Sequence, residues 1–250
     1  MSQIDPLSQK AYWEEAGRQG YLLYMYSAGE VERHVTTRLR PMAVDIGRAL
    51  GLGRNSSVLE LGCGDGSFAN EYLAQNFGQI RAVDFSEAAI ARARAESKGS
   101  GTRFETFDLT RQDINDLGHY DGAFLFGILH HVKAATPGLL AKLAKMAPRV
   151  VVQEPNGDNL LRKALEFSPS YRAAGEDSFR TWELVRIFEA AGFKLVVWKR
   201  CNLFPIYTPG LLFRLLRPIE PFVESMPLLR AMCNVNMFGF VAKSLKLRGG

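Results

Sequence analysis

Short apolar runs alternate along the chain with stretches in which apolar residues recur at helical spacing. The runs that we expect to form strands span residues 58–61, 80–84, 103–107, 122–126, 150–153, 193–198 and 237–243. The expected helices span residues 30–50, 67–75, 87–97, 137–146, 159–167 and 178–191. Strands that alternate with helices are typical of βαβ units and a parallel sheet. The pattern therefore predicts an α/β fold.

Three glycines at alternate positions follow the first expected strand. Gly62, Gly64 and Gly66 lie between that strand and a helix. Because glycine inside a regular element is unfavourable by roughly 0.5–1 kcal/mol, three in five residues need a local reason. In a doubly wound sheet this turn faces the ligand crevice. We expect Gly62 to allow a tight turn, and Gly64 and Gly66 to let a ligand approach the backbone. A plain tight turn is the alternative.

Acidic residues stand at the ends of the next two expected strands. Asp84 can accept hydrogen bonds from both ribose hydroxyls of a nucleoside, whereas Ser86 is the better N-cap for the following helix. Asp108 can accept a hydrogen bond from the exocyclic amine of an adenine, with Phe85 and Leu109 packed on the ring. Capping of the next helix is the alternative for Asp108. The two strand ends together favour a nucleoside cofactor.

These residues resemble the motifs of the class I S-adenosylmethionine-dependent methyltransferases. VLELGCGDGSFA (58–69) is similar to the first motif, with Glu60 in the usual acidic place. AVDFSEAAI (82–90) is similar to the ribose motif, FDL (107–109) to the adenine motif and DGAFLFGILHHV (121–132) to the fourth. The resemblance implies that S-adenosylmethionine is bound and leaves as S-adenosylhomocysteine. The cofactor-binding residues that it implies are Glu60, Gly62, Gly64, Gly66, Asp84, Phe85, Asp108, Leu109 and Phe126.

The resemblance covers roughly residues 45–200 and implies a Rossmann-like fold. We expect a seven-stranded, mostly parallel sheet with helices on both faces and an antiparallel last strand. The whole chain, 1–250, is expected to be a single methyltransferase domain. Its expected parts are an N-terminal arm and helix (1–50), a cofactor-binding core (51–200), an apolar cap insertion (201–236), and a last strand and tail (237–250). The arm contains the aromatic residues Tyr12, Trp13, Tyr21, Tyr24 and Tyr26.

Two other classes of protein compete with this interpretation. A nicotinamide-dependent oxidoreductase needs Gly-x-Gly-x-x-Gly, but Ser67 stands where the last glycine of that fingerprint belongs. A catalytically inactive cofactor-binding module need not keep the glycines, Asp84 and the paired histidines. We therefore expect an active enzyme.

The paired histidines His130 and His131 follow the fourth expected strand, at the rim where donor and acceptor meet. A hydroxyl acceptor must lose its proton, and a histidine that titrates near pH 7 suits this task. We expect only one ring to face the cleft, because side chains alternate at a strand end. The second histidine is the more usual one in the related methyltransferases, so His131 is the expected base and His130 the second candidate. The alternative is that both rings only orient the loop.

Three further residues are candidates for binding the acceptor. Glu154 closes the fifth expected strand, where it lines the acceptor pocket or caps a neighbouring helix. Residues 168–179 read as a polar loop, from which Tyr171, Arg172 and Glu176 can reach the same cleft. Loops in that position tend to carry specificity. Asp158 is the expected N-cap of the helix 159–167.

A long apolar segment, 199–236, separates the last two expected strands. Leucines recur there at helical spacing, and prolines divide the segment into short helices. We expect residues 204–232 to cover the acceptor cleft and to contact a membrane surface peripherally, because arginines flank the apolar face. A dimer face and a cap that only completes the core are the alternatives. The expected acceptor is small or lipid-linked.

Composition narrows the partners and the compartment. The chain has 250 residues, of which 47% are hydrophobic and 23% charged, as in globular proteins. The first ten residues, MSQIDPLSQK, lack the apolar core of a signal peptide, and three cysteines without metal-ligand spacing indicate reduced thiols. A cytoplasmic protein without a metal is expected. The net charge of +5 fits an anionic partner or simple solubility. No Asn/Asp-Pro-Pro-Tyr/Phe motif or dense Lys/Arg run indicates nucleic acid.

Overall fold

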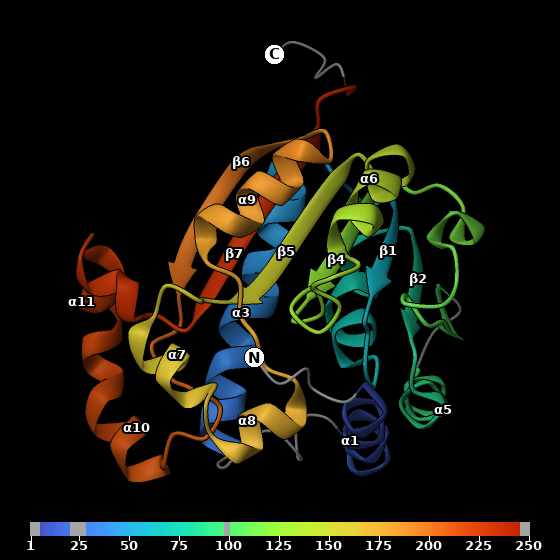
Figure 1. The fold of residues 1–250 in the computed structure, drawn as a ribbon. Helices are drawn as coiled ribbons and strands as arrows, with labels where there is room; N and C mark the ends of the chain where they lie inside the picture. Colours follow the sequence, from blue (N-terminus) through green and yellow to red (C-terminus); the bar gives the residue numbers. More distant parts are fainter. Residues whose placement is uncertain (1–5, 21–28, 98–100, 246–250) are drawn as a thin grey trace.

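One seven-stranded sheet organises the computed structural model, which describes residues 6–20, 29–97 and 101–245 (Figure 1). The strands are Ser57–Leu61 (β1), Gln79–Asp84 (β2), Thr102–Thr106 (β3), Gly122–Phe126 (β4), Arg149–Pro155 (β5), Phe193–Cys201 (β6) and Val235–Ala242 (β7). Their order across the sheet is β3-β2-β1-β4-β5-β7-β6. β1 to β5 pair in parallel, and β7 runs antiparallel to both of its neighbours. The predicted fold class and all seven predicted strands are confirmed.

The strand order reverses between β1 and β4. The chain passes from β1 outward to β2 and β3, and then returns to add β4 on the other side of β1. In open α/β sheets, ligands bind in the crevice outside the carboxyl ends of the strands at such a switch point. The glycine loop after β1 and the histidines after β4 therefore lie at the same edge of the sheet.

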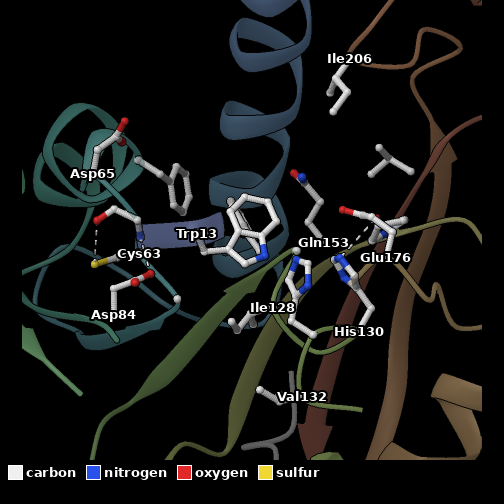
Figure 2. A pocket seen from close by; sticks show the side chains of 18 of the residues that line it. Trp13, Cys63, Asp65, Asp84, Ile128, His130, Val132, Gln153, Glu176 and Ile206 are labelled. Carbon is white, nitrogen blue, oxygen red and sulfur yellow. Dashed lines mark hydrogen bonds and ion pairs between the residues drawn. The ribbon is translucent and has the colours of Figure 1, made fainter. Parts of the chain in front are cut away.

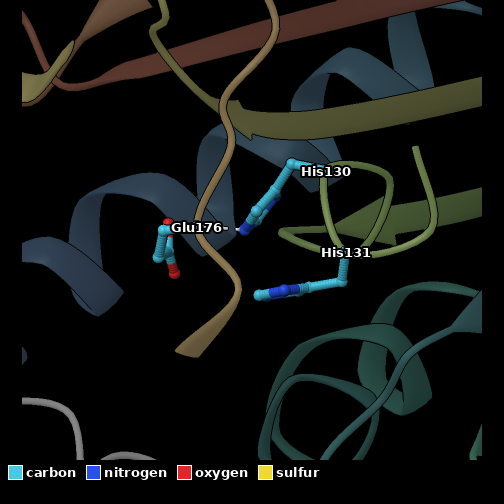
Figure 3. Close-up of side chains that lie close together, drawn as sticks. All are labelled: His130, His131 and Glu176. Carbon is cyan, nitrogen blue, oxygen red and sulfur yellow. Dashed lines mark ion pairs between the residues drawn. The ribbon is translucent and has the colours of Figure 1, made fainter. Parts of the chain in front are cut away.

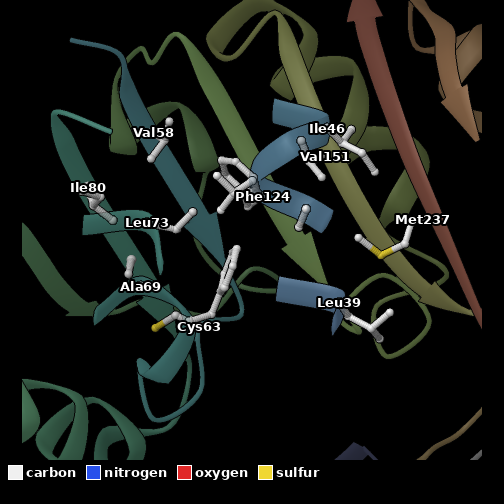
Figure 4. Packing of buried hydrophobic residues seen from close by; sticks show 14 of the residues in the cluster. Leu39, Ile46, Val58, Cys63, Ala69, Leu73, Ile80, Phe124, Val151 and Met237 are labelled. Carbon is white, nitrogen blue, oxygen red and sulfur yellow. The ribbon is translucent and has the colours of Figure 1, made fainter. Parts of the chain in front are cut away.

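Each face of the sheet carries its own hydrophobic core because successive strand residues point to opposite sides. Helix α3 (Gly29–Ala49) covers one face, where its Leu39 and Ile46 join Val58, Phe124 and others in one cluster (Figure 4). Helices α6 (Thr136–Met146) and α9 (Thr181–Ala190) contribute buried side chains to the cluster on the other face. These two cores hold the strand ends, and with them the loops of the crevice, in place.

The N-terminal arm contains a helix, α1 (Pro6–Gln19), which packs on α5 (Glu87–Glu96). The helices lie so close that a Cβ on Gly17 would come within 2.7 Å of the Ser86 Oγ atom. This packing brings Trp13 of α1 beside the crevice. Tyr21, Tyr24 and Tyr26 of the predicted arm lie outside the described residues.

Three local predictions need correction. Residues 168–179, expected as a loop, contain helix α8 (Pro169–Ala174), because Ser168 caps its start and Gly175 ends it in the left-handed conformation. Asn159, not Asp158, caps helix α7 (Leu160–Leu165): its side chain accepts a hydrogen bond from the Arg162 N–H at 3.2 Å. The helix expected at 67–75 is a π-helical turn, Ala69–Leu73, followed by the short α4 (Ala74–Asn76).

The link between β6 and β7 forms short helices, as predicted. They are α10 (Gly210–Leu216), α11 (Glu220–Ser225) and two 3-10 turns, Arg217–Ile219 and Leu229–Met232. Helix α10 packs beside α3, where the Arg214 guanidinium lies 2.9 Å from a carboxylate oxygen of Glu30. Among the described residues, no helix combines the length and apolarity needed to cross a bilayer.

Candidate active site

A cavity of about 840 Å³ opens at the switch point of the sheet (Figure 2). Most of the residues predicted from the sequence line it: Glu60, Gly62, Gly64, Asp84, Phe85, Asp108, Leu109, Phe126, His130, His131 and Tyr171. Three predicted residues do not line it. Gly66 packs under α5, Glu154 is buried behind His130, and Arg172 lies on the exposed side of α8.

The glycine loop is a succession of left-handed turns. Gly62, Gly64 and Gly66 have φ angles of +76°, +54° and +72°, a region that residues with a Cβ rarely adopt. Close packing adds a second requirement at Gly66, where a Cβ would lie 2.6 Å from the Ala93 Cβ. The expectation that Gly66 makes room for a ligand therefore needs correction, because its immediate neighbours belong to the protein itself.

Asp84 ties the glycine loop to the end of β2. Its Oδ2 accepts a hydrogen bond from the Gly64 N–H at 2.9 Å, and its Oδ1 accepts one from the Ser86 N–H at 3.0 Å. The Ser86 hydroxyl in turn caps α5 by accepting from the Ala89 N–H at 3.1 Å, as predicted. Burial raises the pKa of Asp84 to about 6, despite the two backbone donors.

Glu60 is a buried carboxyl with a free hydrogen-bonding atom beside the cavity. Its side chain is almost fully buried, and its Oε2 has no hydrogen-bond partner among the described residues. Burial raises the pKa of Glu60 to about 8, although the nearby Arg40 acts in the opposite direction. A buried, unpaired carboxyl is unfavourable unless a partner arrives, so this end of the cavity fits a cationic group.

Asp108 lies in a turn after β3. Its Oδ1 accepts hydrogen bonds from the Thr110 N–H at 2.9 Å and from the Thr110 hydroxyl at 2.6 Å. The Lys10 ammonium stands 3.5 Å from the other oxygen and also lies over the Phe85 ring. Asp108 therefore stabilises its own turn and closes the cavity together with α1.

The two histidines face each other at the other side of the cavity. The His130 and His131 ring centroids are 3.9 Å apart, and the Trp13 ring meets His131 edge-on at 4.9 Å. Burial and the neighbouring charge of His130 lower the pKa of His131 to about 3. His131 is therefore a neutral imidazole at neutral pH, whereas the sequence predicted a group that titrates near pH 7.

His130 is held between two carboxylates. Its Nδ1 lies 2.7 Å from Glu154 Oε2, and its Nε2 lies 3.5 Å from Glu176 Oε2. Burial alone lowers the pKa of His130, but the two carboxylates outweigh this effect and raise it to about 10. The other oxygen of Glu154 accepts the Leu129 N–H at 2.8 Å. Glu154 therefore orients the histidine loop.

Several residues of the cavity were missed by the sequence analysis. Arg162 of α7 contacts Glu176 and lies over the ring of Tyr171, which in turn meets Tyr207 at a centroid distance of 5.9 Å. Phe204 and Ile206, at the start of the β6–β7 link, line the wall beside them. Nothing in the local sequence of Arg162 marks it, because α7 reaches the cavity only through tertiary packing.

Comparison with known proteins decides the family. A family of proteins described as a methyltransferase domain matches residues 32–197. The chain belongs to this methyltransferase family. The class predicted from the sequence, an S-adenosylmethionine-dependent methyltransferase of class I, is confirmed. A curated relative, an uncharacterised protein of Synechococcus sp., is 36% identical over 107 residues, which cover 41% of this chain. The matched part of this chain covers only about a quarter, 25%, of that relative's length.

Solved structures share the fold at low sequence identity. Magnesium protoporphyrin IX methyltransferase (ChlM) from Synechocystis PCC 6803, with bound S-adenosylhomocysteine, is 18% identical at a TM-score of 0.63, covering 95% of this chain and 100% of that one. The N-methyltransferase NodS from Bradyrhizobium japonicum WM9 is 14% identical at a TM-score of 0.57. The match covers 86% of this chain and 98% of NodS. The [4+2]-cyclase SpnF is 15% identical at a TM-score of 0.66. The match covers 96% of this chain and 97% of SpnF.

Proposed function

We propose that this methyltransferase methylates a hydroxyl oxygen of a small or lipid-linked acceptor and that His131 accepts the hydroxyl proton. The observation that carries the proposal is the pairing of the two rings in the cavity. His130 is charged at neutral pH and His131 is neutral, because their pKa values are about 10 and about 3. Of the two histidines, only the neutral His131 has a ring nitrogen lone pair at neutral pH that can accept the hydroxyl proton during the transfer step.

The donor end of the cavity fits S-adenosylmethionine. The orphaned, buried oxygen of Glu60 would gain a partner in the ammonium group of the methionine part. The backbone of Gly62 and Gly64, which lines the cavity, and the carboxylate of Asp84 would hold the adjoining atoms and the ribose. Phe85, Asp108, Leu109 and Phe126 supply the walls and polar atoms for the adenine. When bound, the donor supplies a methyl group that its sulfonium charge has already activated.

The residues of the chain then have to align the acceptor, remove its proton and exclude water. Trp13 closes the cavity over His131 with its ring edge. Glu154 holds His130 in one orientation, and the His130 ring packs at a tilt against His131. A hydroxyl within hydrogen-bond reach of His131 loses its proton to the imidazole as the methyl group arrives.

The acceptor end of the cavity is largely apolar. Leu165, Phe204, Ile206 and Tyr207 line it, and Tyr171 stands beside them with its hydroxyl. Such walls suit an acceptor with an aromatic or aliphatic body that carries one polar reacting group. ChlM and NodS, which share the fold, are named for a porphyrin acceptor and for N-methylation respectively. They support a small acceptor without indicating which atom is methylated here.

A lipid-linked acceptor is supported by the surface beside the cavity. Helices α7 and α10, with the link around α11, present large apolar side chains to solvent: Leu160, Leu161, Phe167, Leu211, Leu212, Leu215, Ile219, Phe222, Met226, Leu228 and Met232. The Asn159 side chain donates to the Met232 carbonyl at 2.8 Å, which joins the start of α7 to the end of the link. Arg217 and Arg230 are exposed within this apolar surface. A surface of this kind suits a bilayer with anionic head groups.

The test of the proposed function is a methylation assay with isotopically labelled S-adenosylmethionine and fractionated cell extract, both aqueous and lipid. Mass spectrometry should find the label on oxygen, with one S-adenosylhomocysteine formed for each product. Label on nitrogen or carbon would overturn the proposed O-methylation. The cyclase SpnF shares the fold, so a second candidate is a cofactor-binding protein without transfer. Donor binding without any labelled product from either fraction would favour that candidate.

A further inference from the structure

The side chains of His130, His131 and Glu176 form a cluster of potential metal ligands in the cavity, which proton transfer alone does not require. The two histidines come from the loop after β4, and Glu176 comes from the segment after α8 (Figure 3). One ligand atom from each of the three residues lies within 4.8 Å of the other two. Two imidazoles and one carboxylate are a ligand set that binds divalent transition metals. Hard cations such as Mg²⁺ and Ca²⁺ prefer oxygen ligands alone.

The Nε2 atom of His130 is a second, independent indication that this cluster binds a ligand. His130 is only 4% exposed, and its Nε2 makes no hydrogen bond within the described residues. The atom lies 3.5 Å from Glu176 Oε2, which is too distant for a good hydrogen bond. A buried polar nitrogen without a hydrogen bond is unfavourable. A cation bound between this nitrogen and the ligand atoms of His131 and Glu176 would give it a partner.

Glu154 contacts the other ring nitrogen of His130, Nδ1, which faces away from Glu176. It engages His130 Nδ1 at 2.7 Å, and its other oxygen is fixed by the Leu129 N–H. Histidines that bind metals almost always donate their second ring N–H to a carboxylate or carbonyl, which sets the tautomer and the orientation of the ring. A metal ion would have to displace the Nε2 proton of the charged His130. In the resulting neutral ring the remaining proton stays on Nδ1, facing Glu154, and the Nε2 lone pair is directed toward Glu176.

We propose that His130, His131 and Glu176 bind a divalent transition-metal ion of the Zn²⁺ or Fe²⁺ class at the acceptor end of the cavity. The contacts of Glu176 with Arg162 and His130 both use Oε2, so neither uses Oε1. With three protein ligands, the ion keeps open positions toward the cavity. The proposal does not rest on the base role of His131. A ring nitrogen that binds the ion cannot accept a proton at the same time, so the two states exclude each other.

The test uses the full chain, stripped of metal by dialysis against a chelator. Titration with Zn²⁺ in a calorimeter should show one saturable ion per chain, and Co²⁺ should give the visible absorption of a low-symmetry nitrogen and oxygen site. Glu176→Gln and His131→Asn should each weaken Zn²⁺ binding by about tenfold or more. Glu154→Gln should weaken it by roughly 10- to 100-fold, the usual effect of losing an outer partner. His119→Asn is the matched control, because His119 is exposed and lies outside the cluster.

Circular dichroism shows whether each variant is folded, and the wild-type stoichiometry is decisive even if one variant is not. The absence of saturable Zn²⁺ uptake by the wild type would overturn the proposal. So would equal affinity in the wild type, Glu176→Gln and His131→Asn. A Co²⁺ spectrum with a thiolate charge-transfer band would place the ion on cysteine instead and would also overturn it.

Discussion

The ring centroids of His130 and His131 lie 3.9 Å apart with the ring planes tilted by 42°, and only His130 is a charged imidazolium at neutral pH. Glu154 and Glu176 hold the charge on His130. Burial, and then the repulsion between adjacent imidazolium ions, lower the pKa of His131 and keep it neutral. His130 is therefore a buried cation paired with carboxylates, and His131 is a neutral ring beside it; both line the cavity.

The first prediction concerns His131. His131→Asn should lower the turnover number by about 10²–10⁴ and leave the affinity for S-adenosylhomocysteine unchanged, because a general base acts only in the transfer step. Since the pKa of His131 is lowered to about 3, this ring should stay unprotonated above about pH 4. The rate should therefore show no His131 inflection between pH 6 and 8, and should fall only in acid. Stopped assays across this range, with His119→Asn as the control, check the prediction. A neutral inflection that disappears in His131→Asn would contradict it.

The second prediction concerns Asp84. Its carboxylate accepts the Gly64 N–H and would also bind the ribose, so Asp84→Ala should weaken S-adenosylhomocysteine binding by roughly 1.5–3 kcal/mol, the value of charge-assisted hydrogen bonds. Asp84→Asn keeps an oxygen for the loop but not the charge, and should lose less. Calorimetry measures both affinities. An unchanged dissociation constant in Asp84→Ala would remove the ribose role.

The third prediction concerns the proton on Glu60. Its pKa is raised from 4.5 to about 8 in the free protein, so at pH 7 the folded state holds a proton that the unfolded state has lost. The stability from this group is present below about pH 4.5 and is lost as the pH rises through about 8. A cationic ligand group beside Glu60 favours the ionised carboxylate, so donor binding should release a proton at pH 7.

Calorimetry in two buffers with different ionisation enthalpies measures that release. The affinity for S-adenosylhomocysteine should increase between pH 6 and 8, and Glu60→Gln should lose this dependence. Asp84, with a pKa of about 6, contributes mainly at the lower end of the range. If Glu60→Gln released as many protons as the wild type, Glu60 would not be the linked group.

Strands were the best-predicted part of the chain, because buried parallel strands leave short apolar runs that are visible in the sequence. The sequence also predicted that Gly62, Gly64 and Asp84 lie together at the cavity, since all three are adjacent to strand ends. Helix α8 was missed although Ser168, Pro169 and Gly175 are a start and stop signal, because the polar composition of the segment outweighed them. The charge states of His130 and His131 could not be predicted, because they depend on Glu154 and Glu176 from distant segments.

The fourth prediction concerns the attachment of α11 to α3. The Arg38 guanidinium lies 2.6 Å from Glu220 and 2.8 Å from Glu224, and Glu220 is only 2% exposed. Arg38→Met leaves these carboxylates without their main cation, so the free energy of unfolding should fall by about 3 kcal/mol. Urea denaturation measures the change. Arg18→Met is the matched control, because Arg18 pairs with Glu15 at an exposed site and should change stability by less than about 1 kcal/mol. Equal effects of the two substitutions would show that the buried pair is not an anchor.

The last prediction concerns the apolar surface of α10. Leu211 and Leu215 lie one helical turn apart and are 72% and 66% exposed, so a charge at either position should leave the core intact. Leu216, by contrast, packs against the core and is unsuitable as a probe. If the surface binds a bilayer, the wild type should float with anionic vesicles in a density gradient and less with neutral ones, since each arginine near a charged surface adds on the order of 1 kcal/mol.

The variant Leu211→Glu/Leu215→Glu should remain at the bottom of the gradient while keeping the wild-type melting temperature. Val196→Glu is the matched control, because Val196 is a half-exposed apolar residue on β6, outside the α7 and α10 surface. It should float like the wild type. A wild type that stays at the bottom with both kinds of vesicle would remove the membrane contact. If the double variant also lost its cooperative melting, these leucines would belong to the folded core, and the apolar segment would serve only to complete it.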